Sequence, residues 1–347
     1  MIELSGLFGN DYGGNVSGNR VLWIDIAKGV AMLAVILGHT YYGGMPAHTF
    51  VYSFHIPLFF ILSGYTFRVK PGAEVVKKSA MQLLLPYIVL SMIIAMYWLT
   101  RGWLNEETAL QFFAGVIFAS GGANLPMGIY PIGIPWFLMA LFISRILYNA
   151  MLGLLQRFSV HMVLQVVLFA FLAWGASKAA EYIALPFAFW QSVIAMFFIH
   201  IGYTLRRLDL AERAPIPLTV ACLAIWVVSL VFDAAFSIGN LWFGASFVIG
   251  AIMAVAASWC VMQACRFIGR HMRRIGGFLA FVGVNSLLVL ELHAVEFRLI
   301  PWTDVAIESI GWLSPVVMGA VHIAFVLCLL ALVVLSPLKM GQKDSSG

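Results

Sequence analysis

Three ionisable side chains, Asp25, Lys28 and His39, occur in one apolar stretch near the start of the chain. Lys28 and His39 are eleven residues apart, close to three helical turns, so a helix would place them on one stripe about 16 Å apart. Asp25 is three residues before Lys28 and can pair with it on the same face. Such a stripe could bind an anion at one end and move a proton at the other. The alternative is that the Asp25–Lys28 pair only fixes helix packing and that His39 lies at the headgroup level.

A second histidine, His55, stands two residues before Pro57 in the next apolar stretch. Proline is favoured in the first turn of a helix, which predicts that a helix begins here with His55 at its positive end. A positive helix end favours neutral imidazole, which suits a general base or a hydrogen-bond donor near pH 7. A packing or interfacial role for His55 is the alternative.

Further polar residues lie in later apolar stretches. Trp136 opens one of them and Arg145 lies deeper in it, while Glu291 and His293 follow one another closely near the end of the chain. Trp136 fits an aromatic belt at the membrane interface as well as a binding site. Arg145 needs an acceptor or a water-filled cavity, and Asp25 is a candidate partner, because ionisable groups inside a membrane cost a few kcal/mol each, about 2.5 to 3.5 on insertion scales.

The elements that must position these residues follow from composition. The 347 residues are 62% hydrophobic and 10% charged, with a mean hydropathy of +0.96, which excludes a water-soluble fold. At about 20 apolar residues per span, the chain has room for roughly ten transmembrane helices in one domain, residues 1–347. We therefore expect an all-α, polytopic integral membrane protein. Its expected spans are 21–41, 50–67, 79–99, 133–153, 160–176, 187–205, 215–233, 242–265, 279–299 and 313–336.

The segments outside these spans carry fewer signals. Residues 1–19 are polar and lack a basic and an apolar region, so we expect no cleaved signal peptide. The connection 100–132 holds an apolar stretch, 110–119, that is too short to span and is expected to be re-entrant or interfacial. The four cysteines lack the spacing of a disulfide framework or a zinc site.

The basic residues predict the orientation of the chain. With the N-terminus inside, fifteen of the twenty Lys and Arg residues lie on the cytoplasmic side, three on the opposite side and two within spans. This bias predicts that both termini are cytoplasmic, the last eight residues, 340–347, forming a short tail. The net charge of +5 is therefore a topology signal, and we expect no nucleic-acid partner. The fifteen are Arg20, Arg68, Lys70, Lys77, Lys78, Arg157, Arg206, Arg207, Arg213, Arg266, Arg270, Arg273, Arg274, Lys339 and Lys343.

Four motifs in this order resemble the acyltransferase-3 family of integral membrane acyltransferases, which includes sugar and polysaccharide O-acetyltransferases. They run from Asp25 to His39, from Phe54 to Tyr65, from Pro135 to Leu138 and from Asn285 to His293. The first two together are fairly specific, and the later ones are weak alone. The resemblance covers most of the chain and implies a single membrane acyltransferase domain of about ten helices in a bacterial inner membrane.

The resemblance also implies substrates and roles. It implies acetyl-CoA or another acyl-CoA as a cytoplasmic co-substrate, no bound cofactor or metal, and an extracytoplasmic sugar or lipid-linked glycan as acceptor. His39 would be the catalytic base, and Lys28 would bind the donor. The family often has arginine in place of Lys28, and lysine keeps the charge but loses bidentate phosphate recognition.

The remaining candidate roles are hypotheses built on this scheme. His55 is a second catalytic candidate, Asp25, Arg145, Arg206 and Arg207 are donor-binding candidates, and Trp136, Glu291 and His293 are acceptor-binding candidates. An acyl-enzyme on Ser63 or Ser286 stays open, although no Ser-His-Asp spacing supports it. A secondary transporter of a small polar solute is the main alternative, since buried charges and broken helices occur there too. The acceptor, the acyl chain and the oligomeric state are not determined by the sequence.

Overall fold

The chain is all-α, as its composition predicts. A computed structural model describes residues 21–40, 46–102, 105–122, 125–126, 128–232, 236–244, 246–300 and 314–334. In this part of the chain the regular elements are helices, and the β contacts amount to one isolated bridge between Ser237 and Trp242. The expected polar segments 1–19 and 340–347, with Arg20, Lys339 and Lys343, lie outside the described residues.

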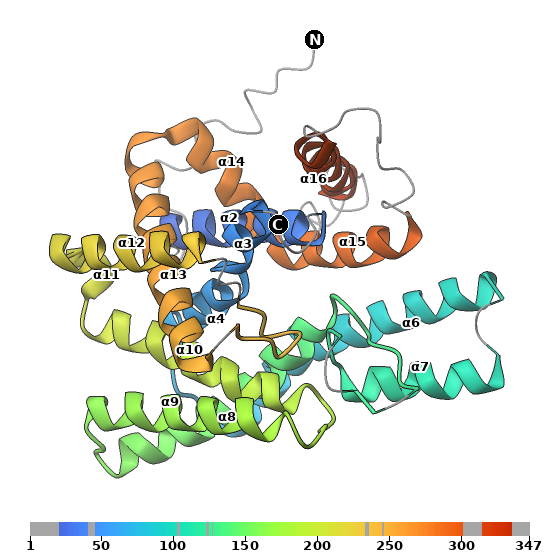
Figure 1. The fold of residues 1–347 in the computed structure, drawn as a ribbon, viewed down its shortest axis with the longest axis horizontal. Coiled ribbons are helices and arrows are strands. Elements are labelled where there is room, and N and C mark those ends of the chain that lie inside the picture. The colour runs from blue at the N-terminus through green and yellow to red at the C-terminus, as the bar shows by residue number, and fades with distance from the viewer. Residues whose placement is uncertain are drawn as a thin grey trace, which may run out of the picture.

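The described part of the chain forms a series of helices (Figure 1). They are α2 (Leu22–Thr40), α3 (Pro46–Tyr52), α4 (His55–Tyr65), α5 (Gly72–Ser79), the π-helical η2 (Ala80–Leu84), α6 (Leu85–Thr100), α7 (Glu106–Phe118), α8 (Trp136–Arg157), α9 (Met162–Ala179), α10 (Phe189–Arg207), α11 (Leu210–Arg213), α12 (Ile216–Val231), α13 (Phe247–His271), α14 (Arg273–Val284), α15 (Ser286–Leu299) and α16 (Ser314–Val334).

Each of the ten expected spans contains a helix or a pair of helices, but not all of them are long and apolar enough to cross a membrane. Among the described residues seven helical segments are, and the bent pair α14–α15 makes an eighth if it counts as one span. The helix α10 has 19 residues but ends in two arginines, and α12 has 16 residues. At 1.5 Å per residue α12 is about 24 Å long, shorter than the hydrocarbon core of about 30 Å. The remaining two expected spans, those that contain α10 and α12, fall short of these measures of length and composition.

The expected span 279–299 is not one straight helix. It is broken at Asn285, where α14 and α15 meet at 69°. The side-chain amide of Asn285 donates a hydrogen bond to the carbonyl of Phe281 at 2.8 Å. That carbonyl, in the last turn of α14, also accepts from the backbone N–H of Asn285 at 3.3 Å, so both donors of the asparagine cap the end of the helix. The apolar pattern continues through this point, which is why the sequence did not indicate the bend.

The helix α2 lies between α14 and α16 and packs against both, and also against α4 and α13 (Figure 1). Two glycines permit the close crossing with α14. A Cβ added to Gly283 would lie 1.8 Å from the carbonyl oxygen of Asp25, and one added to Gly29 would lie 2.0 Å from that of Leu279. Small residues let membrane helices approach closely, and here they fix the helix that carries Lys28 and His39.

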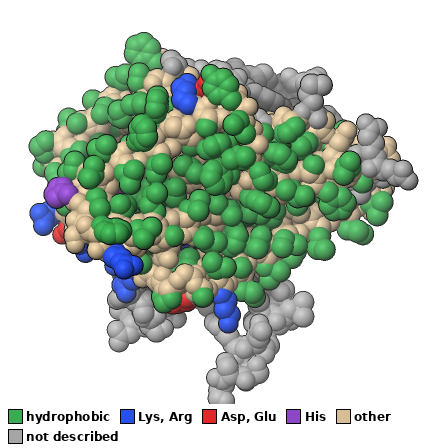
Figure 2. All heavy atoms as spheres, turned by 90° about the horizontal axis from the view of Figure 1, so that it is seen from below, with side chains coloured by type: hydrophobic (Ala, Val, Ile, Leu, Met, Phe, Trp, Pro, Cys, Tyr) green, Lys and Arg blue, Asp and Glu red, His purple; other side chains and the backbone are tan. Residues whose placement is uncertain are grey.

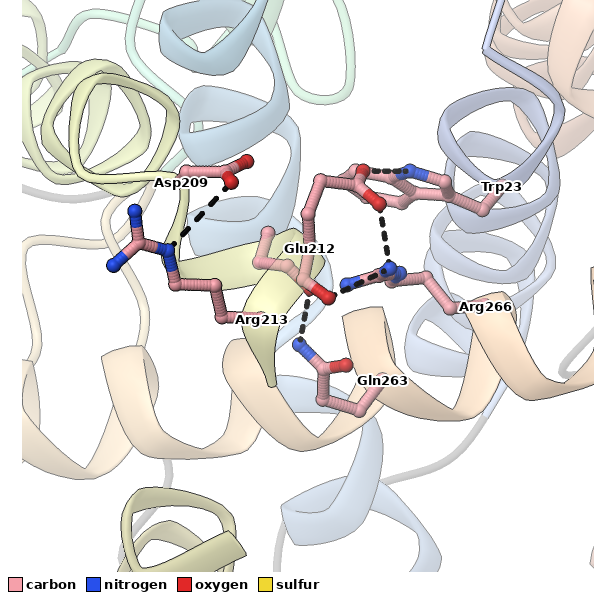
Figure 3. Close-up of polar contacts among 7 residues, drawn as sticks. Trp23, Asp209, Glu212, Arg213, Gln263 and Arg266 are labelled. Atoms are coloured by element: carbon pink, nitrogen blue, oxygen red, sulfur yellow. Dashed lines mark hydrogen bonds and ion pairs between the residues drawn. The ribbon is translucent and has the colours of Figure 1, made fainter. Parts of the chain in front are cut away.

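A polar cluster ties α11 to α13 and α2 at the end of the bundle that holds Asp25 (Figure 3). The guanidinium of Arg266, which is 4% exposed, donates to Glu212 Oε2 at 2.6 Å and to the Glu212 carbonyl at 3.3 Å. The other carboxylate oxygen of Glu212 accepts from the Trp23 indole at 3.3 Å, and Gln263 donates to the carbonyl of Ala211 at 3.5 Å. The buried arginine is thus compensated by a carboxylate and a carbonyl from one short helix.

The connection 100–132 contains a helix, α7, which runs alongside α6 (Figure 1). The Tyr87 hydroxyl donates to the carbonyl of Val116 at 2.5 Å, and the rings of Trp98 and Phe112 are 5.3 Å apart. With 13 residues, α7 is too short to span, in agreement with the sequence. The segment after it returns toward the centre of the molecule.

One face of the molecule is covered by hydrophobic side chains, and the lysines and arginines visible there lie toward its edges (Figure 2). Many large apolar residues of α6, α9 and α12 are exposed in the same way. A contiguous exposed apolar surface of this size is typical of contact with lipid. The chain is therefore a multi-pass membrane protein.

Candidate functional site

A cavity of about 590 Å³ lies between α2, α4, α8 and α15. We call it the central cavity. Its walls are completed by two loop segments, one at 131–135 before α8 and one at 236–240. Five of the ten residues proposed from the sequence line it, namely Lys28, His39, His55, Trp136 and Arg145. These five residues come from three helices, α2, α4 and α8, and meet in one space.

The stripe predicted on α2 is present. Lys28 and His39 both line the central cavity. The ammonium group of Lys28 lies 3.2 Å from the carboxylate of Asp25, so the predicted pair is confirmed. Asp25 itself is outside the cavity lining, and its contact with Lys28 makes it a residue that orients the cation.

The carboxylate of Asp25 is occupied by Lys28, so the structure does not support the expected pair of Asp25 with Arg145. Arg145 lines the cavity, and its buried Nε has no hydrogen-bond partner among the described residues. A cation with an unsatisfied donor in a polar cavity is available to an anionic ligand.

His39 and His55 lie on neighbouring helices that face the same cavity. The imidazole of His39 is half-buried, and its ring centre is 5.4 Å from that of His293 and 5.3 Å from that of Phe297. His55 is buried, and its Nδ1 lies 2.6 Å from the carbonyl oxygen of Val51. Because a carbonyl only accepts, Nδ1 carries the hydrogen, and in the neutral ring Nε2 is the atom left to accept one.

The first turn of α8 brings Trp136 to the wall of the cavity, beside the 236–240 segment. Trp136 is 8% exposed. The indole N–H is a donor without acceptor capacity. The residue therefore lies in the interior wall and not in an exposed aromatic belt, which favours the binding interpretation over the belt interpretation.

Sequence reasoning missed several residues of the cavity. Arg298 is one of the three basic residues counted from the sequence on the side opposite the cytoplasm. It lines the cavity and donates to the carbonyl of Ile132 at 3.3 Å. Phe297 and Asn240 also line it, and nothing in their sequence context distinguishes them. No acidic residue is found among the described residues that line the central cavity, whereas Lys28, Arg145 and Arg298 are cations. Its field thus favours an anionic ligand.

Two serines, Ser63 and Ser286, also line the cavity. Within the described part of the chain, neither hydroxyl is hydrogen-bonded to a histidine. A serine nucleophile needs an adjacent base within hydrogen-bond reach. The geometry therefore does not support either serine as a histidine-activated nucleophile.

Besides Asp25, four of the proposed residues lie outside the cavity lining. Arg206 donates to the carbonyl of Tyr65 at 3.3 Å, and Arg207 is exposed at the end of α10. His293 is fully buried behind His39. Glu291 opens instead onto an apolar groove of about 650 Å³ between α6, α15 and α16, so the structure separates it from the other acceptor-binding candidates.

One group of described residues has the donor types of a metal site. The ligand atoms of His293, Glu296 and His322 lie within 4.8 Å of one another, and all three side chains are buried. Glu296 was not proposed from the sequence, although it stands three residues after His293, a spacing that places both on one helical face.

Comparisons with known proteins agree with the motifs. A family model described as an acyltransferase domain, that of the acyltransferase-3 family, matches residues 21–338. Nodulation protein NolL of Mesorhizobium japonicum is 33% identical over 150 residues, which cover 38% of this chain and 36% of NolL. The similarity thus extends over little more than a third of that relative's length. No solved structure matches the chain.

Proposed function

Because the chain belongs to the acyltransferase-3 family, we propose that it transfers an acyl group, most simply acetyl, from cytoplasmic acyl-CoA to a hydroxyl of an envelope or exported sugar or polysaccharide. The observation that carries this proposal is the central cavity, which Lys28 and His39 line from one helix and His55 from the next. A cationic cavity with two imidazoles has the groups needed to hold a phosphorylated donor and to deprotonate a hydroxyl.

The proposed reaction is a direct transfer. The acceptor hydroxyl oxygen attacks the thioester carbonyl while His39 takes the hydroxyl proton. The tetrahedral intermediate then expels the CoA thiolate, which receives that proton, so the products are the acyl ester and free CoA. The Trp136 indole N–H is our candidate donor to the oxyanion, and His55 Nε2 is our candidate acceptor for a second hydroxyl of the sugar.

The donor is proposed to enter from the cytoplasm. The fifteen-to-three distribution of basic residues supports both termini on that side of a bacterial inner membrane. Lys28, oriented by Asp25, and Arg145 would contact the phosphates of CoA. Arg206 and Arg207, at the end of α10, would attract the donor at the entrance.

A secondary transporter of a small polar solute is the second candidate, favoured by one observation. The helix break between α14 and α15 brings Ser286 to the central cavity, and broken helices at a polar cavity are the usual site of solute binding in transporters. Exchange of a labelled solute across proteoliposomes without consumption of a thioester would support this candidate over the transferase.

The test of the transferase is CoA release from acetyl-CoA by the purified protein supplied with a panel of envelope glycans. His39→Ala is expected to abolish turnover while acetyl-CoA binding is retained, because the base is lost and the donor contacts remain. His161→Ala, on an exposed residue outside the cavity, is the matched control. A wild-type protein that neither binds nor consumes any acyl-CoA would refute the proposal, and full activity in His39→Ala would move the base to His55.

A further inference from the structure

Behind His39 lies a buried chain of hydrogen bonds that joins three helices. Glu296 Oε1 on α15 lies 2.8 Å from His293 Nδ1 on the same helix and 2.5 Å from His322 Nε2 on α16. The chain continues from His322 Nδ1 to the hydroxyl of Thr40 on α2, at 2.7 Å. His293 and His322 are 0% exposed and Glu296 is 3% exposed.

The chemistry of these atoms fixes most of the hydrogens. A carboxylate oxygen accepts, so His293 Nδ1 and His322 Nε2 are the donors. The Thr40 hydroxyl donates to the carbonyl of Ile36 at 2.9 Å, and the same oxygen lies 2.7 Å from His322 Nδ1. Glu296 is the acidic residue of the cluster, and both imidazoles donate to the same oxygen of its carboxylate.

The cluster reaches His39 from two directions. Thr40 is the next residue along α2, and the ring of His293 is 5.4 Å from that of His39. With Nδ1 bound to Glu296, His293 keeps Nε2 as its free ring atom, and this buried atom has no hydrogen-bond partner among the described residues. An acceptor atom in a ring that contacts His39 is placed to respond when His39 gains a proton.

The same three side chains have the composition of a His2Glu zinc site, and the distances discriminate between the two interpretations. In a tetrahedral site with bonds of about 2.0 to 2.1 Å, the ligand atoms stand roughly 3.3 Å apart. Here both nitrogens lie within 2.8 Å of the same oxygen, which are hydrogen-bond separations. The arrangement is therefore that of a carboxylate shared by two imidazole donors.

We propose that Glu296 is a positioning residue for acyl transfer, which acts through His293 on the imidazole of His39. This inference rests on the proposed function. Glu296 would hold His293 in one tautomer and one orientation, and its negative charge would stabilise the imidazolium that forms when His39 accepts the hydroxyl proton. A buried carboxylate has this role behind the histidine of serine hydrolases, where it does not itself take the proton.

Other charged and titratable groups also face His39, and a test must distinguish their effect on its protonation from that of Glu296. They are His55 on α4, His293 and Arg298 on α15, and His322 on α16. Glu296 supplies the negative charge among the described residues of this surrounding, because no lining residue of the cavity is acidic. Removal of this one charge should therefore change how readily His39 gains a proton.

The test compares Glu296→Gln, which keeps size and removes the charge, with Glu181→Gln, an exposed residue at the end of α9. We expect kcat to fall roughly 10- to 100-fold in Glu296→Gln, less than the ~10⁴-fold seen when the triad carboxylate contacts the base directly. The KM for acetyl-CoA should stay unchanged. The acidic limb of the pH–activity profile should move to lower pH, because the base is less readily protonated without the anion. The control should match wild type.

Thr40→Val provides a second variant if Glu296→Gln does not fold. It removes the hydroxyl that ends the series of hydrogen bonds from Glu296 through His322. We expect kcat to fall less than in Glu296→Gln and the acidic limb of the pH–activity profile to move to lower pH, as in that variant. Unchanged kcat and an unchanged limb in either folded variant would overturn the inference. Stoichiometric zinc in the wild type that is lost in Glu296→Gln would overturn it too. If wild type consumes no acyl-CoA, it is the proposed function that fails.

Discussion

Lys28 and His39 stand eleven residues apart on α2 and line the same cavity. Three helical turns separate them, so one helix sets the distance between a cation and an imidazole without help from the rest of the fold. In the proposed reaction this helix would hold the phosphates and the thioester of acyl-CoA at a fixed separation.

Removal of the charge at position 28 should weaken donor binding. Lys28→Gln is expected to raise the KM for acetyl-CoA roughly 10- to 100-fold, the value of one charge-assisted hydrogen bond, with a smaller effect on kcat. Lys28→Arg should retain activity, because it keeps the charge and adds donors. Steady-state kinetics at two salt concentrations would show the salt dependence of KM decreasing in Lys28→Gln.

The matched control for Lys28→Gln is Lys178→Gln. Lys178 also pairs with a carboxylate three residues away, Glu181, but lies outside the central cavity. An equal rise in KM for both variants would show that Lys28 does not contact the donor.

Loss of the His55 imidazole should weaken the use of the glycan acceptor and leave binding of the acyl donor unchanged. In His55→Ala the Nε2 acceptor is lost, and we expect kcat/KM for the glycan to fall roughly 10- to 100-fold. The KM for acetyl-CoA should not change. Steady-state kinetics with the glycan and acetyl-CoA varied in turn would measure the two effects separately. A change in the KM for acetyl-CoA without a change in kcat/KM for the glycan would contradict the role assigned to His55.

The α2–α14 crossing should not tolerate a side chain at Gly283. In Gly283→Ala the new Cβ would lie 1.8 Å from the carbonyl oxygen of Asp25. Overpacking of this kind costs about 1–3 kcal/mol. Gly277→Ala, on the same helix with nothing within 4 Å of the new Cβ, should be neutral or slightly stabilising. Thermal unfolding in detergent would compare the two, and equal midpoints would show that the helices are not in such close contact.

The Glu212–Arg266 pair should contribute measurably to stability. Glu212→Gln leaves the guanidinium of Arg266 buried without its carboxylate. We expect a loss of about 1–3 kcal/mol, below the ~3–5 kcal/mol of an enclosed pair, because Glu212 is 44% exposed. Asp209→Asn breaks the exposed pair with Arg213, at 3.7 Å, and should cost well under about 1 kcal/mol. The same unfolding assay applies, and similar losses in both variants would contradict the distinction.

Much of the site could be predicted from local patterns. The helical period alone indicated that Lys28 and His39 share a stripe, and Pro57 indicated where the helix of His55 begins. The Asp25–Lys28 pair followed from its three-residue spacing and is confirmed. These features need only one helix each, and helical geometry is nearly independent of what surrounds it.

Other parts depended on contacts between distant segments. Glu291 and His293 are two residues apart on α15. Glu291 opens onto the apolar groove between α6, α15 and α16, whereas His293 lies behind His39. Their spacing indicated that they face different directions, but not which of them faces the site. The loop at 131–135 and Arg298 are more than a hundred residues apart in the sequence, yet they contact each other and form one wall of the cavity.

The sequence by itself determined the class of protein and the polar residues that α2 carries on one face. Composition excludes a soluble fold, and the order of the motifs indicates the family, because both are properties of the residues and their spacing. Only the tertiary structure decided that α14 and α15 bend at Asn285, that Arg145 is not the partner of Asp25, and that Glu296 is shared by His293 and His322. These features are set by which helices pack together, and packing in a membrane depends on shape and small residues that leave little trace in an apolar sequence.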